Sequence, residues 1–232
     1  RPETPTKAWL LLPAMMIAAA ALRVYGITHE SLWWDEYASH VHLNAPSLLE
    51  FLRMNRTLDP LTLPFYYVFE YLWAHYIHDA VLSLRLLSVA IGVATLPFIY
   101  LLGKRTHSAG AGYAAALLLA LSPAHIHHSQ GIRMYVMFVF LAAAAVYTFM
   151  LLLEAPRRCW WLAHGLAFLF LYWTHPFAGL LTAALGLFLL LNLRAYGAFF
   201  FRWTCMQALL IGPSAAYLAS VRFWPQDTTS DW

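Results

Sequence analysis

The sequence contains few charged residues and almost no cysteine. Charged side chains make up only 11% of its 232 residues, whereas soluble domains carry about a quarter. They are too few to cover the surface of a soluble protein of this length. The net charge of +3 is scattered along the chain and gives no indication of a nucleic-acid partner. The two cysteines, Cys159 and Cys205, have no disulfide or metal-site spacing, which favours a role in packing.

Apolar residues dominate the chain instead. They make up 62% of the sequence, and the mean hydropathy is +0.61. Apolar runs of roughly 17–25 residues recur along the chain, and each is long enough to cross about 30 Å of hydrocarbon. Backbone groups in lipid must be hydrogen-bonded internally, so these runs predict helices. The predicted fold class is all-α, a polytopic membrane helical bundle.

About seven transmembrane helices are predicted, and the basic residues decide how they are oriented. A further apolar stretch, 61–77, is placed along the outer surface, because a crossing there would translocate the basic doublets at 104–105 and 157–158 against the positive-inside tendency. The N-terminus is then cytoplasmic, as are Arg1, Lys7, Arg194 and Arg202. The predicted crossings are 8–27, 81–103, 109–124, 134–154, 159–174, 177–193 and 201–222.

This topology brings three polar segments, 28–37, 124–133 and 175–176, to one face of the membrane. Ionisable groups clustered at a membrane face indicate a site. In the first segment, Trp33 and Trp34 are typical interfacial anchors. Asp35 and Glu36 come next, and two interpretations stay open: they begin a helix, whose N-terminus favours acids, or they carry catalysis.

Histidines and arginines supply the other candidates on this face. His125, His127 and His128 either ligate a metal or are interfacial histidines with polar partners. His175 lies between two crossings, where it is either structural or part of the site. Arg133 opens a helix on the outer face, where its planar fork suits phosphate oxygens.

Two further arginines, Arg23 and Arg85, lie at outer helix ends in the same way as Arg133. Each of the three either binds a ligand or extends its side chain toward lipid headgroups.

Five stretches between residues 31 and 181 carry a family resemblance when they are read in order. They are SLWWDE, DPLTLPFYY, LSLRLLSVAIGV, SPAHIHHSQGIRMY and YWTHPFAGLL. The sequence resembles the membrane glycosyltransferases of the GT-C class, in the branch that contains protein O-mannosyltransferases and the lipid A aminoarabinose transferase (glycosyltransferase family 39 and its relatives). The resemblance implies one module over residues 1–232, with seven membrane helices and two interfacial helices in the first outer loop, 28–80.

The resemblance also implies an activity. A sugar would pass from a polyprenyl-phosphate donor to a lipid, glycan or protein acceptor at the non-cytoplasmic face, with inversion, in what we expect to be a bacterial inner membrane. Asp35 matches the catalytic base of the family, with Glu36 beside it, and Arg133 would meet the donor phosphate. The further substrate-binding candidates are Arg85, His128, Gln130 and His175.

One position departs from the family pattern. Gly131 stands where relatives commonly carry a glutamate, so we expect no metal ligand there and no need for a divalent metal. Relatives are commonly longer, and a C-terminal region that selects the acceptor is expected to be missing. The alternative is a non-catalytic scaffold or subunit that binds a lipid or another membrane protein. A lipid-sugar transporter ranks lower, since the predicted helix centres are almost purely apolar.

Overall fold

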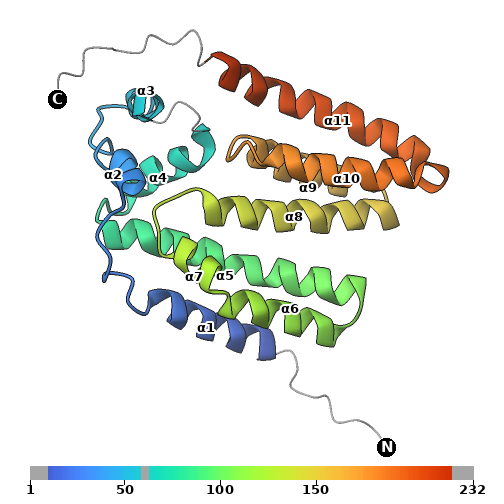
Figure 1. The fold of residues 1–232 in the computed structure, drawn as a ribbon, viewed down its shortest axis with the longest axis horizontal. Helices are drawn as coiled ribbons and strands as arrows, with labels where there is room; N and C mark the ends of the chain where they lie inside the picture. Colours follow the sequence, from blue (N-terminus) through green and yellow to red (C-terminus); the bar gives the residue numbers. More distant parts are fainter. Residues whose placement is uncertain (1–9, 59–62, 221–232) are drawn as a thin grey trace, which may run out of the picture.

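The regular structure is helical throughout the computed structural model, which describes residues 10–58 and 63–220 (Figure 1). This confirms the all-α prediction for the described residues. The ends of the first and last predicted crossings, and Arg1, Lys7 and residues 61–62, lie outside them. The longer helices are α1 (Leu11–Val24), α5 (Val81–Thr106), α6 (Ala109–Leu121), α8 (Tyr135–Glu154), α9 (Arg158–Tyr172), α10 (Ala178–Leu191) and α11 (Leu193–Ala219).

Two of these helices, α5 and α8, are long and apolar enough to cross a membrane by themselves. A third span results if α6 is joined to the short helix α7 (Pro123–Ser129), from which it is bent by 60°. Helices α1 and α10 are also apolar but shorter. The chain is therefore an integral membrane protein with two or three clear candidate spans, and seven crossings stay a prediction.

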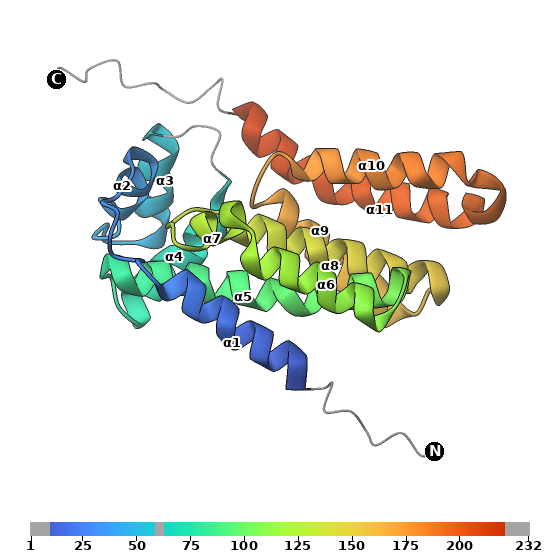
Figure 2. The ribbon, with the colours of Figure 1, turned by 60° about the horizontal axis from the view of Figure 1, so that its bottom comes forward.

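The long helices lie side by side and alternate in direction, so that their ends gather at two ends of the molecule (Figures 1 and 2). The connections from α5 to α6, from α8 to α9 and from α10 to α11 share one end. The basic doublets predicted to be cytoplasmic lie at this end, and Arg105 forms an ion pair there with Glu154 of the neighbouring α8. The segments around residues 25–35, 122–135 and 173–177 lie at the opposite end.

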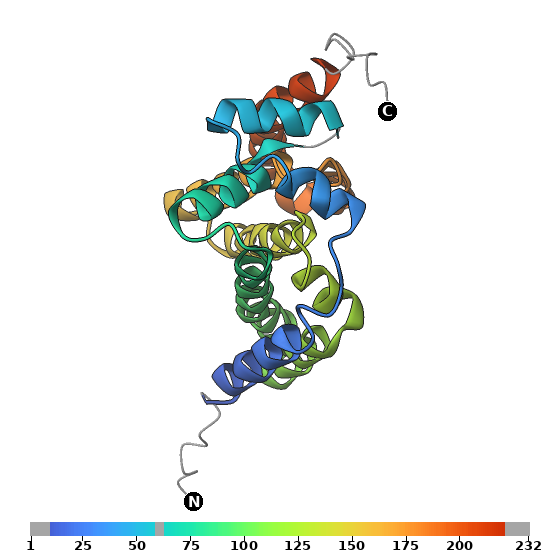
Figure 3. The same cartoon turned by 90° about the vertical axis from the view of Figure 1, so that its left-hand side faces the viewer.

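The first outer loop forms three helices where two were expected. They are the short α2 (Trp34–His40), α3 (Leu48–Leu58) and α4 (Pro64–Tyr76). Figure 3 shows them against one end of the bundle. The side chains of Phe51 and Tyr66 are fully buried and join the same apolar core as Phe168 of α9. The loop is therefore packed onto the bundle through aromatic side chains.

Helices α5 and α6 approach each other through glycines. A Cβ atom added at Gly103 would lie 2.8 Å from the Cα of Gly112, and one added at Gly112 would lie 2.5 Å from the carbonyl oxygen of Tyr100. Small residues allow such close backbone contact between membrane helices. Cys159 and Cys205 are free and exposed, so neither is packed inside the helical bundle.

Candidate functional site

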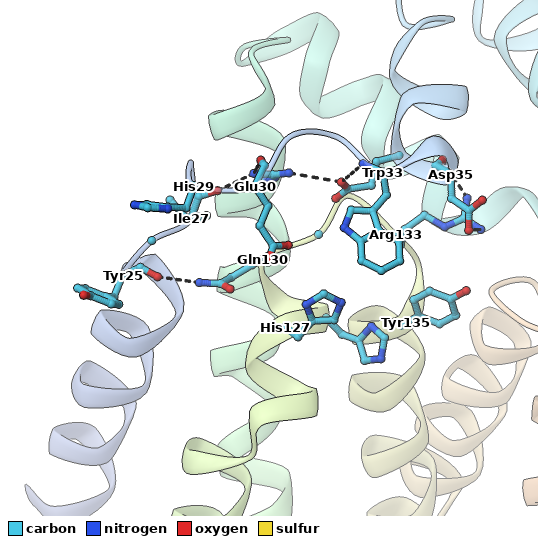
Figure 4. A pocket seen from close by; sticks show the side chains of 15 residues that line it. Tyr25, Ile27, His29, Glu30, Trp33, Asp35, His127, Gln130, Arg133 and Tyr135 are labelled. Atoms are coloured by element: carbon cyan, nitrogen blue, oxygen red, sulfur yellow. Dashed lines mark hydrogen bonds and ion pairs between the residues drawn. The ribbon is translucent and has the colours of Figure 1, made fainter.

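A cavity of about 640 Å³ opens where the end of α1, the start of α2, α5, α7 and the start of α8 meet (Figure 4). Six of the seven predicted site residues line it: Asp35, Glu36, Arg85, His128, Gln130 and Arg133. His175 does not line it, but its ring lies 6.0 Å from the ring of Tyr135, which does. Tertiary contacts thus join residues that are about 100 positions apart in the sequence.

Asp35 and Glu36 each contact an arginine of this cavity, and Asp35 is the more exposed of the two. It lies in the first turn of α2, and 61% of its side chain is exposed. Its Oδ2 atom lies 3.7 Å from Nη2 of Arg133. The Nη1 atom of the same arginine donates to the backbone carbonyl of Asp35 at 3.3 Å. Arg133 therefore fixes both the backbone and the carboxylate at this position.

Arg133 also forms a hydrogen bond with Tyr67 of α4. The arginine side chain is only 12% exposed, and its Nη1 atom donates to the hydroxyl oxygen of Tyr67 at 2.9 Å. Burial lowers the pKa of Arg133, but Tyr67 and Asp35 outweigh it, so its pKa is raised and the guanidinium stays charged. Tyr67 lies within one of the stretches that carry the family resemblance, but no local pattern shows that α4 turns this ring toward residue 133.

Glu36 has a different environment from its neighbour. Its side chain is 5% exposed, and Oε1 accepts a hydrogen bond from the backbone amide of Ile132 at 2.6 Å. Oε2 accepts from the amide of Trp33 at 3.0 Å and lies 3.4 Å from Nη2 of Arg85. Glu36 joins the first outer loop to the segment before α8, and this geometry favours a positioning role over a reacting one.

Gly131 lies directly against this carboxylate. A Cβ atom added there would be 3.1 Å from Oε1 of Glu36, which is tighter than ordinary van der Waals contact. The space where a side chain at 131 would begin is thus bordered by a carboxylate from the first loop. A side chain at this position would require the carboxylate of Glu36 to move by a few tenths of an ångström.

Arg85 and Gln130 donate to backbone carbonyls at the end of α1 and in the loop that follows it. Nη1 of Arg85 donates to Ile27 at 2.6 Å and to Glu30 at 2.9 Å. Nε2 of Gln130 donates to Arg23 at 3.0 Å and to Tyr25 at 2.8 Å. Both residues line the cavity, but these contacts shape its wall.

Arg23 does not extend toward lipid headgroups. It is fully buried, and its guanidinium donates to the carbonyls of Leu119 and Ala120 at the end of α6. It also contacts Nδ1 of His125 at 2.9 Å. The interpretation that Arg23 extends toward lipid headgroups was wrong, because its guanidinium is enclosed and donates to carbonyls at the end of a neighbouring helix.

The three histidines of segment 124–133 have different surroundings. His125 is buried beside Arg23, whereas His127 and His128 line the cavity. The pKa of His128 is lowered, first by burial and then by repulsion from His127, which keeps the ring neutral near pH 7. Within residues 10–58 and 63–220, no three His, Cys, Asp or Glu side chains are grouped to hold a metal ion.

Aromatic rings form one wall of the cavity. The ring of Trp33 lies 5.8 Å from that of His127, and His128 lies 4.9 Å from Tyr135. Trp33 is 61% exposed. Trp33 was predicted to be a membrane anchor, and no role was predicted for Tyr135. Trp33 and Tyr135 lie close in the sequence to Asp35 and Arg133, and this proximity could have predicted that both rings lie at the cavity.

Comparison with known proteins identifies one family. The family model described as dolichyl-phosphate-mannose-protein mannosyltransferase matches residues 64–214. The match covers more than half of the chain, from α4 into α11, and includes Tyr67, Arg85, Arg133 and His175. Asp35 and Glu36 precede it. No curated protein matches the chain.

Proposed function

Because the chain belongs to the dolichyl-phosphate-mannose-protein mannosyltransferase family, we propose that it is a GT-C-type membrane glycosyltransferase whose substrates meet in the cavity around Asp35. The donor is a sugar linked to a polyprenyl phosphate, and the acceptor carries a hydroxyl group. The observation that carries the proposal is the pairing of an exposed carboxylate, Asp35, with a half-buried arginine, Arg133, 3.7 Å away in one cavity.

The reaction asks two things of the protein. The acceptor oxygen forms a bond to the anomeric carbon while the bond from that carbon to the phosphate oxygen breaks, which inverts the carbon. The acceptor proton passes to the carboxylate of Asp35, acting as a general base. The leaving phosphate keeps the bonding electrons, and its charge is stabilised by the guanidinium of Arg133.

Glu36, which lines the cavity, and Tyr67, which lies outside its lining, position these two groups. Glu36 joins the segment that carries Asp35 to the segment that carries Arg133 through the amide of Ile132. Tyr67 orients Arg133. Helices α2, α3 and α4 pack over this end of the bundle and would limit access of water to the donor.

The proposed topology has seven crossings with a cytoplasmic N-terminus, and the cavity opens at the non-cytoplasmic face. The support is the separation of charge along the bundle. The Arg105–Glu154 pair and the basic doublets lie at the end opposite the cavity (Figure 1), and basic residues favour the cytoplasmic side.

The test is transfer from a panel of polyprenyl-phosphate sugars by the purified protein in lipid nanodiscs. Asp35→Asn keeps the shape of the side chain and removes its basicity, so we expect turnover to fall by about 10²-fold or more, while binding of the donor is retained. Asp79→Asn is the matched control, because Asp79 is 65% exposed and does not line the cavity.

Two outcomes would contradict the proposal. Near-normal turnover of Asp35→Asn would remove Asp35 from the mechanism. Binding of the donor without turnover by the wild-type protein, for every sugar and acceptor tested, would favour the alternative of a lipid-binding scaffold.

A further inference from the structure

A second cavity, of about 380 Å³, lies between α9, α10 and α11 and shares no residue with the first. Figure 2 shows the α10–α11 hairpin beside α9. The volume is within the range of roughly 300–1,000 Å³ that is usual for ligand pockets. The lining residues are Tyr172, Thr182, Gly186, Leu190, Phe200, Trp203, Thr204, Gln207, Ala208 and Ile211.

One polar group in this cavity needs a partner. Gln207 is 3% exposed, and its Oε1 atom accepts a hydrogen bond from the hydroxyl of Tyr172 at 2.8 Å. Its Nε2 atom is buried and has no hydrogen-bond partner among the described residues. A buried donor without an acceptor is costly, and more so where the surroundings are lipid. The cavity therefore favours a ligand that brings one acceptor.

The polar end of the cavity lies near the ends of two helices. Tyr172 is the last residue of α9, and Thr182 lies in the second turn of α10. Gly186 and Leu190 follow Thr182 at intervals of four residues, which places all three on one face of α10. From Thr182, the lining continues along α10 with Gly186 and Leu190, which have no polar side-chain atoms. The cavity is therefore a groove with one polar end, of a shape that suits a hydrocarbon chain.

Glycine keeps this groove open. A Cβ atom added at Gly186 would lie 3.5 Å from the indole ring of Trp203 on α11. A larger side chain at 186 would therefore fill the space between α10 and α11. The outer faces of the same helices are apolar and exposed, at Leu187, Leu191 and Leu209, as is expected of helices in contact with lipid.

We propose that this groove binds an acyl chain of a membrane phospholipid, whose ester carbonyl accepts a hydrogen bond from Nε2 of Gln207. An ester carbonyl supplies the single acceptor, and the hydrocarbon chain fills the apolar part. A polyprenyl phosphate would bring a charged phosphate, and no cationic side chain among the described residues lines this groove to balance it. A transmembrane helix has its backbone carbonyls already hydrogen-bonded internally. The site is separate from the proposed transfer reaction and does not depend on it.

The test uses a phosphatidylcholine with a photoreactive diazirine in its acyl chain, in nanodiscs of phosphatidylethanolamine and phosphatidylglycerol. After illumination of the full chain, mass spectrometry locates the cross-links, which we expect on α10 and α11 at the groove. Gly186→Leu should reduce this labelling several-fold. Gly179→Leu is the matched control on the same helix, since a Cβ atom there meets nothing within 4 Å.

An ether-linked version of the same probe tests the hydrogen bond in the wild-type protein, without any substitution. The ether lacks the carbonyl, so it should label the groove less than the ester. In Gln207→Leu the two probes should label equally, because the donor is gone. Equal labelling of the wild type by both probes would overturn the proposal. So would unchanged labelling of a folded Gly186→Leu, or labelling of the groove as strong with a photoreactive polyprenol.

Discussion

At the residue scale, two adjacent carboxylates have opposite surroundings. Asp35 is 61% exposed and meets Arg133 at the cavity, whereas Glu36 is 5% exposed and accepts two backbone amides. The helical turn at the start of α2 separates them, because consecutive side chains of a helix do not share a face. The two residues therefore predict different responses to the same kind of substitution.

Glu36→Gln should reduce stability. A charge-assisted hydrogen bond is worth about 1.5–3 kcal/mol, and the amide would also turn a donor toward either Ile132 or Trp33. We expect a lower melting temperature in detergent, whereas Asp35→Asn should melt close to the wild type. Glu50→Gln is the control, because Glu50 forms an exposed pair with Arg53. A stable Glu36→Gln variant without turnover would reverse the two roles.

Arg133 is expected to neutralise the donor phosphate without a metal ion. Divalent cations such as Mg²⁺ need several oxygen ligands, while Glu36 in this cavity is already bonded to backbone amides. Turnover should therefore persist in excess chelator. Arg133→Lys keeps the charge but loses the planar fork that contacts Asp35 and Tyr67, so turnover should fall by about tenfold or more.

Arg53→Lys is the matched control for this substitution, since Arg53 also lies 3.7 Å from a carboxylate but is 55% exposed. Loss of turnover on chelation, with recovery in Mg²⁺ or Mn²⁺, would contradict the prediction. Asp35 and Glu36 would then be reassigned as metal ligands.

At the scale of elements, the contact between α5 and α6 depends on two glycines. Gly112 faces the backbone of α5, and a Cβ atom there would overlap the carbonyl of Tyr100. Gly112→Val should separate the helices and destabilise the protein by about 1–3 kcal/mol, the usual effect of overpacking. Unfolding in a detergent titration measures this.

Gly110→Val is the control, because it changes the same helix in the same way and a Cβ atom there has its nearest neighbour 3.8 Å away. Equal stability of the two variants would mean that α5 and α6 do not depend on close backbone contact at Gly112.

At the scale of the whole molecule, the topology can be tested by labelling. Cys159 and Cys205 are exposed and must first be replaced by serine. Single cysteines in place of His107 and Pro156, which lie at the end of the bundle with the basic doublets, should react only with membrane-permeant reagents. A cysteine in place of His128 should react with impermeant ones. Labelling of position 107 from outside would exclude the proposed topology.

The sequence by itself determined the all-helical fold class and six of the residues that line the cavity. Long apolar runs with few charges leave no alternative to membrane helices, because lipid cannot hydrogen-bond a bare backbone. The basic doublets predicted which ends of the helices are cytoplasmic. The polar segments at the opposite ends were then predicted to share one face of the membrane. Six of the seven predicted site residues line one cavity for this reason.

Only the tertiary structure decided what each of these residues contacts. Arg23 and Arg133 look alike in the sequence, yet one supplies donors to the end of α6 and the other contacts Asp35. Tyr67 reaches Arg133 from a helix 66 positions earlier. Periodicity and charge report which side of an element a residue occupies, whereas a hydrogen bond depends on how distant elements pack, and no local pattern encodes that distance.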